Sequence, residues 1–403
     1  MARTVEIRDP GPLLDLLPPG SPFAWLRRGE GIVGWGTAAA VRTAGPDRFA
    51  DASQWWREVV RVAAVADEVN SAGTGLICMG SFAFADEPGD SILTVPSVVV
   101  GRRGDTCWVT TIGEHDSPAP ELVPTTPPTP PVNLSYSDGA LSGAEWESVV
   151  WEAVLHLNAG ELDKVVLARD LIATADEPID VRWALQRLDS FYEMCWTFQV
   201  DGLFGATPEM LVRRERGLVT SRVLAGTIRR TGDDAHDAAL AGQLARSSKD
   251  LEEHEYAVRS VAEALAPYCS SMNVPETPFV LHLPNVMHLA SDVAGVAVEG
   301  GGTVLELAAA LHPSAAVGGT PTKLAVEMIA EIEQLDRWRY AGPVGWMDAS
   351  GDGEFGIALR SGQWSGNTVR LFAGCGIVAG SDPEAELAES QAKFVPVRDA
   401  LSD

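Results

Sequence analysis

The sequence predicts an α+β protein built on large, mostly antiparallel sheets with helices packed outside them. The strand candidates are short apolar runs that meet through tight turns, without the helical crossovers that parallel strands need. The clearest pair joins residues 340–350 to residues 353–361 through a Gly-Asp-Gly turn. With 403 residues, of which 46% are hydrophobic and 21% charged, the chain is long enough to bury a sizeable core.

A proline-rich stretch divides the chain. Seven of the fifteen residues at 117–131 are proline, and such a segment favours extended polyproline conformation over a helix or a central strand. We therefore expect residues 1–116 to form an N-terminal part of the fold, residues 117–134 a linker, and residues 135–403 a second, larger domain. In the first part we expect mainly antiparallel strands and one helix near 54–69, and we find no chemical motif there.

The second domain contains both strands and helices. Ser142 and Glu145 have the spacing of a capping box, which predicts a helix that ends near Gly160. A further N-cap is predicted at Ser381, with Glu384 three residues later. Helices are expected at 236–266, 303–311, 321–336 and 383–401. Strands are expected at 164–173, 195–200, 217–226 and 369–380.

Composition argues against several classes of function. The net charge of −26 disfavours nucleic-acid binding, because a phosphate backbone is bound by basic patches. Five scattered cysteines without a CxxC pair disfavour a zinc site and a disulfide framework. There is no apolar run of about 18 residues and no signal-peptide core, so we expect a cytoplasmic protein without membrane contact. The phosphate-loop, HExxH and GxSxG motifs are missing as well.

Carboxylates are the best candidates for a metal site. The histidines lack metal-ligand spacing, and His288 is expected to be a hydrogen-bonded core residue. Asp250 and Glu253 are three residues apart, so on a helix they share a face, and Glu386 and Glu389 repeat that spacing. Two such pairs facing each other would make an oxygen-rich site suited to Mg²⁺. Taken singly, each pair is explained as well by an ordinary solvated helix face, and spacing alone leaves both interpretations open.

Eight segments in a fixed order give the sequence a family resemblance. They are KVVLARDL, ATPEML, VLAGTIRR, SKDLEEHEYAV, LPNVMHLASDVAG, LHPSAAVGGTP, YAGPVGWMDASGDGEFGIALRS and AGCGIVAGSDPEAELAESQAK. Together they resemble the chorismate-utilising enzymes, a family that includes isochorismate, salicylate, anthranilate and aminodeoxychorismate synthases. The resemblance covers about residue 135 to the C-terminus. It implies an α/β sandwich fold and makes residues 135–403 the chorismate-binding catalytic domain.

The resemblance also implies which nucleophile is used. Isochorismate and salicylate synthases carry a lysine at the start of the first segment, where it acts as the general base on water, and here this residue is Lys164. The aminodeoxychorismate branch has a nucleophilic lysine immediately before a Gly-Thr pair. This chain has Ala225 before Gly226 and Thr227, so a covalent lysine intermediate is excluded there and water is the expected nucleophile.

One further position favours isochorismate synthase within the family. Salicylate synthases tend to have threonine where this chain has Ala316. They also tend to have tyrosine at the position of Tyr340, but tyrosine occurs there in menaquinone-type isochorismate synthases as well. The expected reaction is therefore the Mg²⁺-dependent isomerisation of chorismate to isochorismate. Salicylate synthase and a non-catalytic chorismate-binding protein remain the alternatives. The resemblance favours a monomer, and it leaves open whether the product feeds menaquinone or siderophore synthesis.

The remaining site residues are assigned by their positions in the family pattern. Glu209 matches the general acid, which must be protonated beforehand and so needs a raised pKa. Glu253 and Glu389 match the direct Mg²⁺ ligands, with Asp250 and Glu386 acting through metal-bound water. The substrate-contacting positions are Gly226, Thr227, Ala316, Tyr340, Arg360, Gly374, Gly376 and Lys393.

Overall fold

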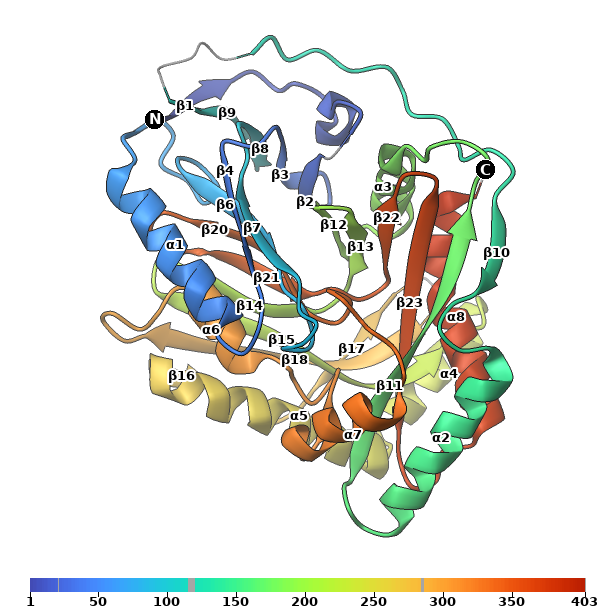
Figure 1. Cartoon of the computed structure of the whole chain (residues 1–403). Helices are drawn as coiled ribbons and strands as arrows, with labels where there is room; N and C mark the ends of the chain where they lie inside the picture. The colour runs from blue at the N-terminus through green and yellow to red at the C-terminus, as the bar shows by residue number, and fades with distance from the viewer. Residues whose placement is uncertain (21, 115–119, 284–285, 403) are drawn as a thin grey trace.

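The computed structural model describes residues 1–20, 22–114, 120–283 and 286–402, apart from the side chains of Lys249 and Glu253. Its strands form two large sheets, one thirteen-stranded and one ten-stranded, with helices around the outside (Figure 1). Apart from the parallel contact between the first and fifth strands, the strand pairs within the described ranges are antiparallel. The predicted fold class, with large antiparallel sheets and external helices, is confirmed.

The first sheet contains strands from both ends of the chain. In spatial order its strands are β10 (Ser135–Asp138), β11 (Lys164–Thr174), β23 (Thr368–Ile377), β22 (Ser361–Ser365), β13 (Leu203–Thr207), β12 (Trp196–Val200), β2 (Phe23–Arg27), β3 (Glu30–Trp35), β8 (Val98–Arg103), β9 (Thr106–Ile112), β1 (Ala2–Ile7) and β5 (Val65–Asp67), with β19 (Gly319–Thr320) on β11. The second sheet runs β16 (Cys269–Asn273), β18 (Val286–Ala297), β15 (Leu218–Arg229), β14 (Met210–Glu215), β21 (Gly353–Ile357), β20 (Pro343–Asp348), β6 (Ile77–Ser81), β7 (Ser91–Val95) and β4 (Ala39–Thr43), with β17 (Phe279–His282) on β18.

Helices cover the outer faces and the ends of the sheets. They are α1 (Arg48–Val62), α2 (Gly143–Asn158), α3 (Val181–Phe191), α4 (Asp234–Leu244), α5 (Ser248–Leu265), α6 (Val304–Leu311), α7 (Thr322–Ile332) and α8 (Pro383–Leu401), with single turns at Leu13–Leu16 and Ala266–Tyr268. In Figure 1, α1 and α6 lie on one side of the molecule, and α2 and α8 lie together on the other. In the described ranges, no helix combines the length and the apolar character needed to cross a membrane.

Strands from before and after the proline-rich stretch are hydrogen-bonded to each other in both sheets. In the first sheet β12 pairs with β2, and in the second β20 pairs with β6. The largest buried apolar cluster likewise joins side chains of both sheets to α1, α2, α5, α6 and α7. Residues 120–131 have no regular secondary structure, and residues 115–119 lie outside the described part. The division at 117–134 stays a prediction.

Several local predictions are confirmed. The capping box at Ser142 forms, with the Ser142 hydroxyl accepting from the Glu145 N–H and the Glu145 carboxylate accepting from the Ser142 N–H. The turn at 351–353 joins β20 to β21 as expected. Helices at 303–311 and 383–401 are present with boundaries within one residue.

Some element boundaries were wrong, each for a local reason. The helix expected near 54–69 is α1, which ends at Val62 because residues 65–67 pair with β1 instead. The span 236–266 is two helices, because the Ser247 hydroxyl caps a new helix by accepting from the Asp250 N–H. The helix expected at 321–336 stops at Ile332, and Gln334 adopts a left-handed conformation at φ 54°.

The N-cap predicted at Ser381 is one residue too early. Asp382 caps α8, its carboxylate accepting from the Ala385 N–H at 2.9 Å. The Ser381 hydroxyl instead accepts from the Val378 N–H and donates to Glu386 Oε1 at 2.8 Å. Ser381 therefore orients a carboxylate at the start of α8.

Candidate active site

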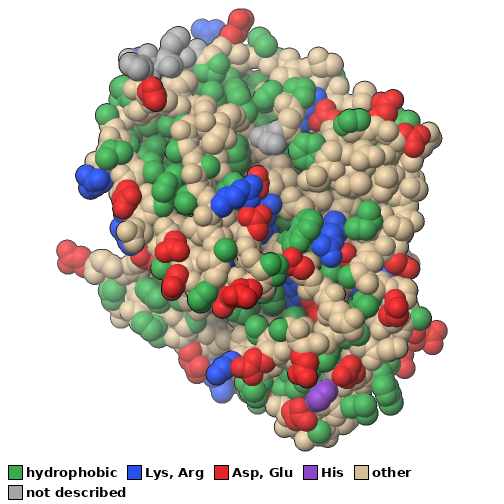
Figure 2. Space-filling view, viewed as in Figure 1, with side chains coloured by type: hydrophobic (Ala, Val, Ile, Leu, Met, Phe, Trp, Pro, Cys, Tyr) green, Lys and Arg blue, Asp and Glu red, His purple; other side chains and the backbone are tan. Residues whose placement is uncertain are grey.

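A cavity of about 220 Å³ lies where the two sheets meet. It is bounded by β11 and β23 of the first sheet, β15 and β18 of the second, the first turn of α5, the middle of α8 and the loop at 312–319. Acidic side chains are spread over the face of the molecule shown in Figure 2, as the net charge of −26 requires. The cavity is lined by two lysines and two arginines as well as by three carboxyl groups, so positive charge is available to an anionic ligand there.

Twelve of the predicted site residues line this cavity. They are Lys164, Glu209, Gly226, Thr227, Asp250, Ala316, Tyr340, Arg360, Gly374, Gly376, Glu389 and Lys393. Glu386 lies next to Glu389, while the side chain of Glu253 falls outside the described part. Residues more than 200 positions apart in the sequence thus face one small space.

The side chain of Lys164 reaches the cavity by passing over β23, the strand next to its own strand β11. It is the first residue of β11, which pairs with β23 so that Val166 lies opposite Gly376. A Cβ atom added to Gly376 would lie 2.8 Å from Lys164 Cε, closer than real Cβ contacts come. Glycine at this position therefore leaves the space that the lysine side chain occupies.

Replacing Gly376 by alanine is expected to displace Lys164 while leaving the fold intact, because the clashing atom is near the end of a flexible side chain. A displacement of about 1 Å in a catalytic group can cost about 100-fold in rate. We expect kcat with chorismate to fall by about tenfold to 100-fold, measured beside Gly380→Ala, where an added Cβ meets nothing within 4 Å. Equal rates in the two variants would contradict the close approach.

Glu209 is a buried carboxyl group. It lies between β13 and β14, and its backbone is fixed by the Thr207 hydroxyl, which accepts from its N–H, and by the Ile357 N–H, which donates to its carbonyl. Burial raises the pKa of Glu209 to about 8, although Lys164 and Arg360 both act to lower it. At neutral pH this group is a protonated acid, as the general-acid role requires.

Basic and hydroxyl groups gather on the β23 side of the cavity. Lys393 Nζ donates to the carbonyl of Gly374 at 2.9 Å and forms an ion pair with Glu389 at 2.6 Å. The buried Tyr340 ring stacks on Phe372, with centroids 5.2 Å apart. Within the described part of the chain, Arg360 has no carboxylate within ion-pair distance, so its guanidinium remains available to an anionic ligand.

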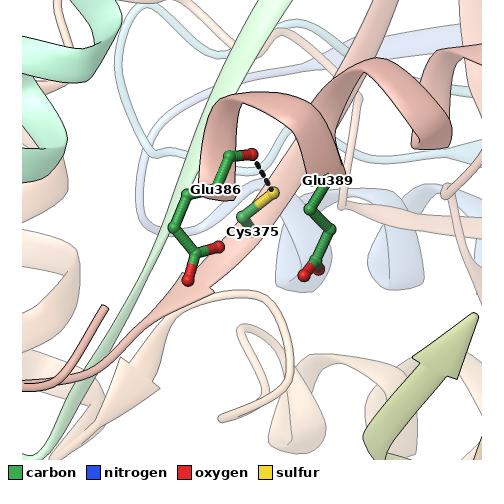
Figure 3. Close-up of side chains that lie close together, drawn as sticks. All are labelled: Cys375, Glu386 and Glu389. Carbon is green, nitrogen blue, oxygen red and sulfur yellow. Dashed lines mark hydrogen bonds between the residues drawn. The ribbon is translucent and has the colours of Figure 1, made fainter. Parts of the chain in front are cut away.

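Carboxylates gather at one end of the same cavity. Figure 3 shows Glu386 and Glu389 extending from α8 on either side of Cys375, and the potential ligand atoms of these three residues lie within 4.8 Å of one another. Burial raises the pKa of Cys375 to about 12, and its thiol donates to the carbonyl of Glu386 at 3.5 Å. The sulfur is therefore a neutral thiol, and the carboxylate oxygens are the available ligands.

Asp250 lines the same cavity from the first turn of α5, beside a bulge in the facing strand β15. The register between β15 and β18 shifts at Gly226, which has φ +76°. A Cβ there would lie 3.2 Å from Asp250 Cβ, so glycine accommodates both the left-handed backbone and the close approach of α5. Burial of Glu389 raises its pKa, but the nearby Lys393 lowers it. The net result is a pKa below the ordinary value for a glutamate. The described carboxylates thus offer an oxygen-rich set of the kind Mg²⁺ prefers.

Two polar residues of the cavity wall were missed by the sequence analysis. His288 was expected to be a satisfied core residue, but it lines the cavity with Nδ1 3.0 Å from the Thr227 hydroxyl, and its Nε2 has no partner among the described residues. Burial, together with Arg360 and Lys393, lowers its pKa to about 3, so the ring is neutral. Arg337 lines the cavity as well, and no local sequence signal marks it.

Comparison with known proteins identifies the family. The family model described as "Chorismate binding enzyme" matches residues 21–402. The chain belongs to this family of chorismate-binding enzymes. The putative isochorismate synthase MenF of Mycobacterium tuberculosis is 36% identical over 343 residues, which cover 82% of this chain and 87% of that protein.

Another relative is similar in sequence, and a solved structure is similar in fold. The isochorismate synthase DhbC of Bacillus subtilis is 41% identical over 261 residues. The matched residues make up 62% of this chain and 66% of the Bacillus subtilis protein, so the match spans slightly less than two thirds of that protein's length. Among solved structures, the putative 2,3-dihydroxybenzoate-specific isochorismate synthase DhbC of Bacillus anthracis superposes with a TM-score of 0.79 at 32% identity, covering 96% of this chain and 98% of that one.

Proposed function

We propose that this protein is an isochorismate synthase, which isomerises chorismate to isochorismate. The observation that carries the proposal is the cavity that holds a lysine at the start of β11 together with a glutamic acid kept protonated by burial. The similar proteins named isochorismate synthase support the same reaction. Water adds at C2 of the ring, the C4 hydroxyl leaves, and the ring double bonds shift.

The two proton transfers fall to different residues. Lys164 takes a proton from the attacking water, so that hydroxide is delivered to C2. Glu209 gives its proton to the C4 oxygen, which departs as water. The reaction leaves Lys164 protonated and Glu209 ionised. Lys164 then loses one proton to solvent and Glu209 takes one up, which restores both groups. No atom is gained or lost overall, as an isomerisation requires.

Mg²⁺ would be held by the carboxylate end of the cavity. We propose Glu253 and Glu389 as direct ligands, with Asp250 and Glu386 acting through metal-bound water. When bound, the ion supplies positive charge that neutralises the ring carboxylate of chorismate. The described carboxylates at this end support the assignment through their donor type and their proximity.

The second carboxylate of chorismate would bind at the β23 end. Arg360 presents a planar fork of donors that suits a carboxylate, and the Tyr340 hydroxyl and the backbone at Gly374 and Gly376 belong to residues that line the same cavity. The side chains of Thr227 and Lys393 would contact the ring of chorismate and fix its position in the cavity. The neutral His288 ring, with its free Nε2, would contact the substrate directly without adding charge.

Product analysis tests the proposal directly. The purified protein is incubated with chorismate and Mg²⁺ and the products are separated by chromatography. Isochorismate is expected as the sole new product. The small Ala316 at the cavity wall favours this outcome over salicylate formation. Salicylate and pyruvate appearing without a second enzyme would contradict the proposal and assign the protein as a salicylate synthase. The monomeric state and the cytoplasmic location stay predictions from the sequence.

Replacing Glu389 by glutamine is expected to raise the Mg²⁺ concentration for half-maximal activity by at least about tenfold, because a direct carboxylate ligand is lost. The measurement is the initial rate as a function of Mg²⁺, with Mn²⁺ binding followed by electron paramagnetic resonance. Glu384→Gln, an exposed change in the first turn of the same helix, is the matched control. An unchanged metal requirement in Glu389→Gln would remove this residue from the ligand set.

A further inference from the structure

A second cavity, of about 490 Å³, lies between strands of both sheets and outside the active site. Its wall is formed by β2, β3, β8 and β12 of the first sheet and by β14 and β21 of the second. In Figure 1, β2, β3 and β8 lie in the upper part of the view, whereas α5, which bounds the active site, lies in the lower part. None of the residues assigned to chorismate or metal binding lines this cavity. Its volume is within the usual range of small-molecule sites.

The wall of this cavity is rich in arginine. The whole chain has 30 basic and 56 acidic residues, but the cavity is lined by five arginines and only two glutamates. The arginines are Arg27, Arg28, Arg102, Arg103 and Arg213, and we call the space they line the arginine cavity. The charge balance of the molecule is reversed there, which favours an anionic ligand.

Three of the five arginines are already paired with carboxylates of the chain. The pairs are Arg102 with Asp9, Arg103 with Glu215, and Arg213 with both Glu215 and Glu354. The second lining glutamate, Glu30, is exposed and accepts from the Gly104 N–H at 3.1 Å. The positive charge that remains available to a ligand therefore belongs to Arg27 and Arg28.

Arg27 is half-buried and has no carboxylate within ion-pair distance in the described ranges. Its Nε donates to the carbonyl of Met194 at 3.1 Å, and its Cζ lies 4.2 Å from the centroid of the Trp196 ring. Burial lowers the pKa of Arg27, and the nearby Arg222 and Arg28 lower it further. An anion beside Arg27 would offset both the burial and the repulsion.

The turn between β2 and β3 brings the second arginine to the same space. Neighbouring side chains of a strand point to opposite faces, but Arg28 leaves the strand and lines the cavity together with Arg27. Arg28 has a left-handed backbone at φ 56°, and Gly29 follows at φ 73°. Asparagine, aspartate and glycine are the usual residues at the first of these positions. Arginine thus occupies a position that its backbone disfavours, which indicates a role for its side chain.

We propose that the arginine cavity binds a small organic anion with at least two oxyanion groups, carboxylate or phosphate, through the guanidinium groups of Arg27 and Arg28. Each guanidinium presents a planar fork of N–H donors that fits either kind of group. The Trp196 ring beneath Arg27 holds that guanidinium in place, so little conformational freedom is lost when the anion binds.

Binding is tested without turnover, on the full-length protein in EDTA and at low ionic strength. Citrate, phthalate and pyrophosphate are titrated by isothermal calorimetry. At least one is expected to bind, and the stronger of citrate and pyrophosphate identifies the preferred oxyanion. Arg27→Gln and Arg28→Gln should each weaken binding by about tenfold, because one charged hydrogen-bonding group is lost. Arg61→Gln, an exposed change in the last turn of α1 outside the cavity, should bind as the wild type does.

The proposal is overturned if none of the three anions binds, or if binding is unchanged in a folded cavity variant. Because Arg28 is exposed, Arg28→Gln keeps the test valid even where Arg27→Gln does not fold. Raising the salt concentration from about 20 mM to about 200 mM should weaken binding severalfold, since the attraction is electrostatic. An affinity that does not depend on salt would also contradict the proposal.

The location of the anion is tested separately, because the active site carries cationic side chains as well. Arg360→Gln, which changes an arginine of the active-site cavity, should bind the probe as tightly as the wild type. A loss of binding in Arg360→Gln equal to that in Arg28→Gln would place the anion in the active site and overturn the assignment. A failure of the proposed reaction is a separate result, since these measurements involve no turnover.

Discussion

Replacing Lys164 by alanine is expected to lower kcat for isochorismate formation by about 10²-fold to 10⁴-fold, the range that a general base contributes. The affinity for chorismate should change much less, because Arg360, Lys393 and the metal carboxylates remain. The measurement combines steady-state kinetics with calorimetric binding of chorismate. Retained turnover in Lys164→Ala would remove the lysine from its catalytic role.

Lys164→Arg separates basicity from charge. Arginine keeps the positive charge but does not lose its proton in proteins, so it cannot accept one from water. We expect this variant to be as inactive as the alanine variant. Recovery of most of the wild-type rate in Lys164→Arg would mean that the residue acts only through its charge on the substrate.

Replacing Glu209 by glutamine should lower kcat by about 10²-fold to 10⁴-fold as well, since the amide cannot supply a proton to the leaving hydroxyl. In the wild type, the active form of Glu209 is the protonated one, and burial holds its pKa at about 8. This form is present below pH 8 and is lost as the pH rises through that value. The rate should therefore fall by about tenfold per pH unit above 8.

The pH profile provides the sharper check on Glu209. The residual activity of Glu209→Gln should lack the decline above pH 8, because the group that loses its proton is gone. Rates are measured from pH 6 to 10 at saturating Mg²⁺, with circular dichroism to verify folding. A wild-type rate that is flat from pH 7 to pH 9, or a decline that persists in Glu209→Gln, would contradict the assignment.

Local sequence patterns predicted which helices and strands form better than they predicted where these elements begin and end. The capping box at Ser142 was identifiable because both of its hydrogen bonds join residues three positions apart. The break at Ser247 was missed, because nearly uniform helix propensity on either side hid a cap formed by a single hydroxyl. The early end of α1 depends on the parallel pairing of residues 65–67 with β1, which is a tertiary contact that no local pattern contains.

The candidate site was predicted from the order of its sequence segments, and spacing alone would not have found it. The acidic pairs of α5 and α8 are equally typical of a solvated helix face, and only the fold brings Asp250 and Glu389 to one cavity. Arg337 and His288 were missed for a related reason. Their roles depend on which carbonyls and hydroxyls the two sheets bring near them, and this information is absent from the local sequence.

The pairing of β2 with β12 and of β6 with β20 has a consequence for how the chain reaches its native state. In both sheets, strands more than 150 residues apart in the sequence are hydrogen-bonded to each other. Neither sheet can therefore be completed until both halves of the chain have been synthesised. Separating the two halves of the chain at the proline-rich stretch would leave the edges of β2, β12, β6 and β20 without their partner strands. We expect either half produced alone to aggregate, and co-expression of the two halves to recover soluble material.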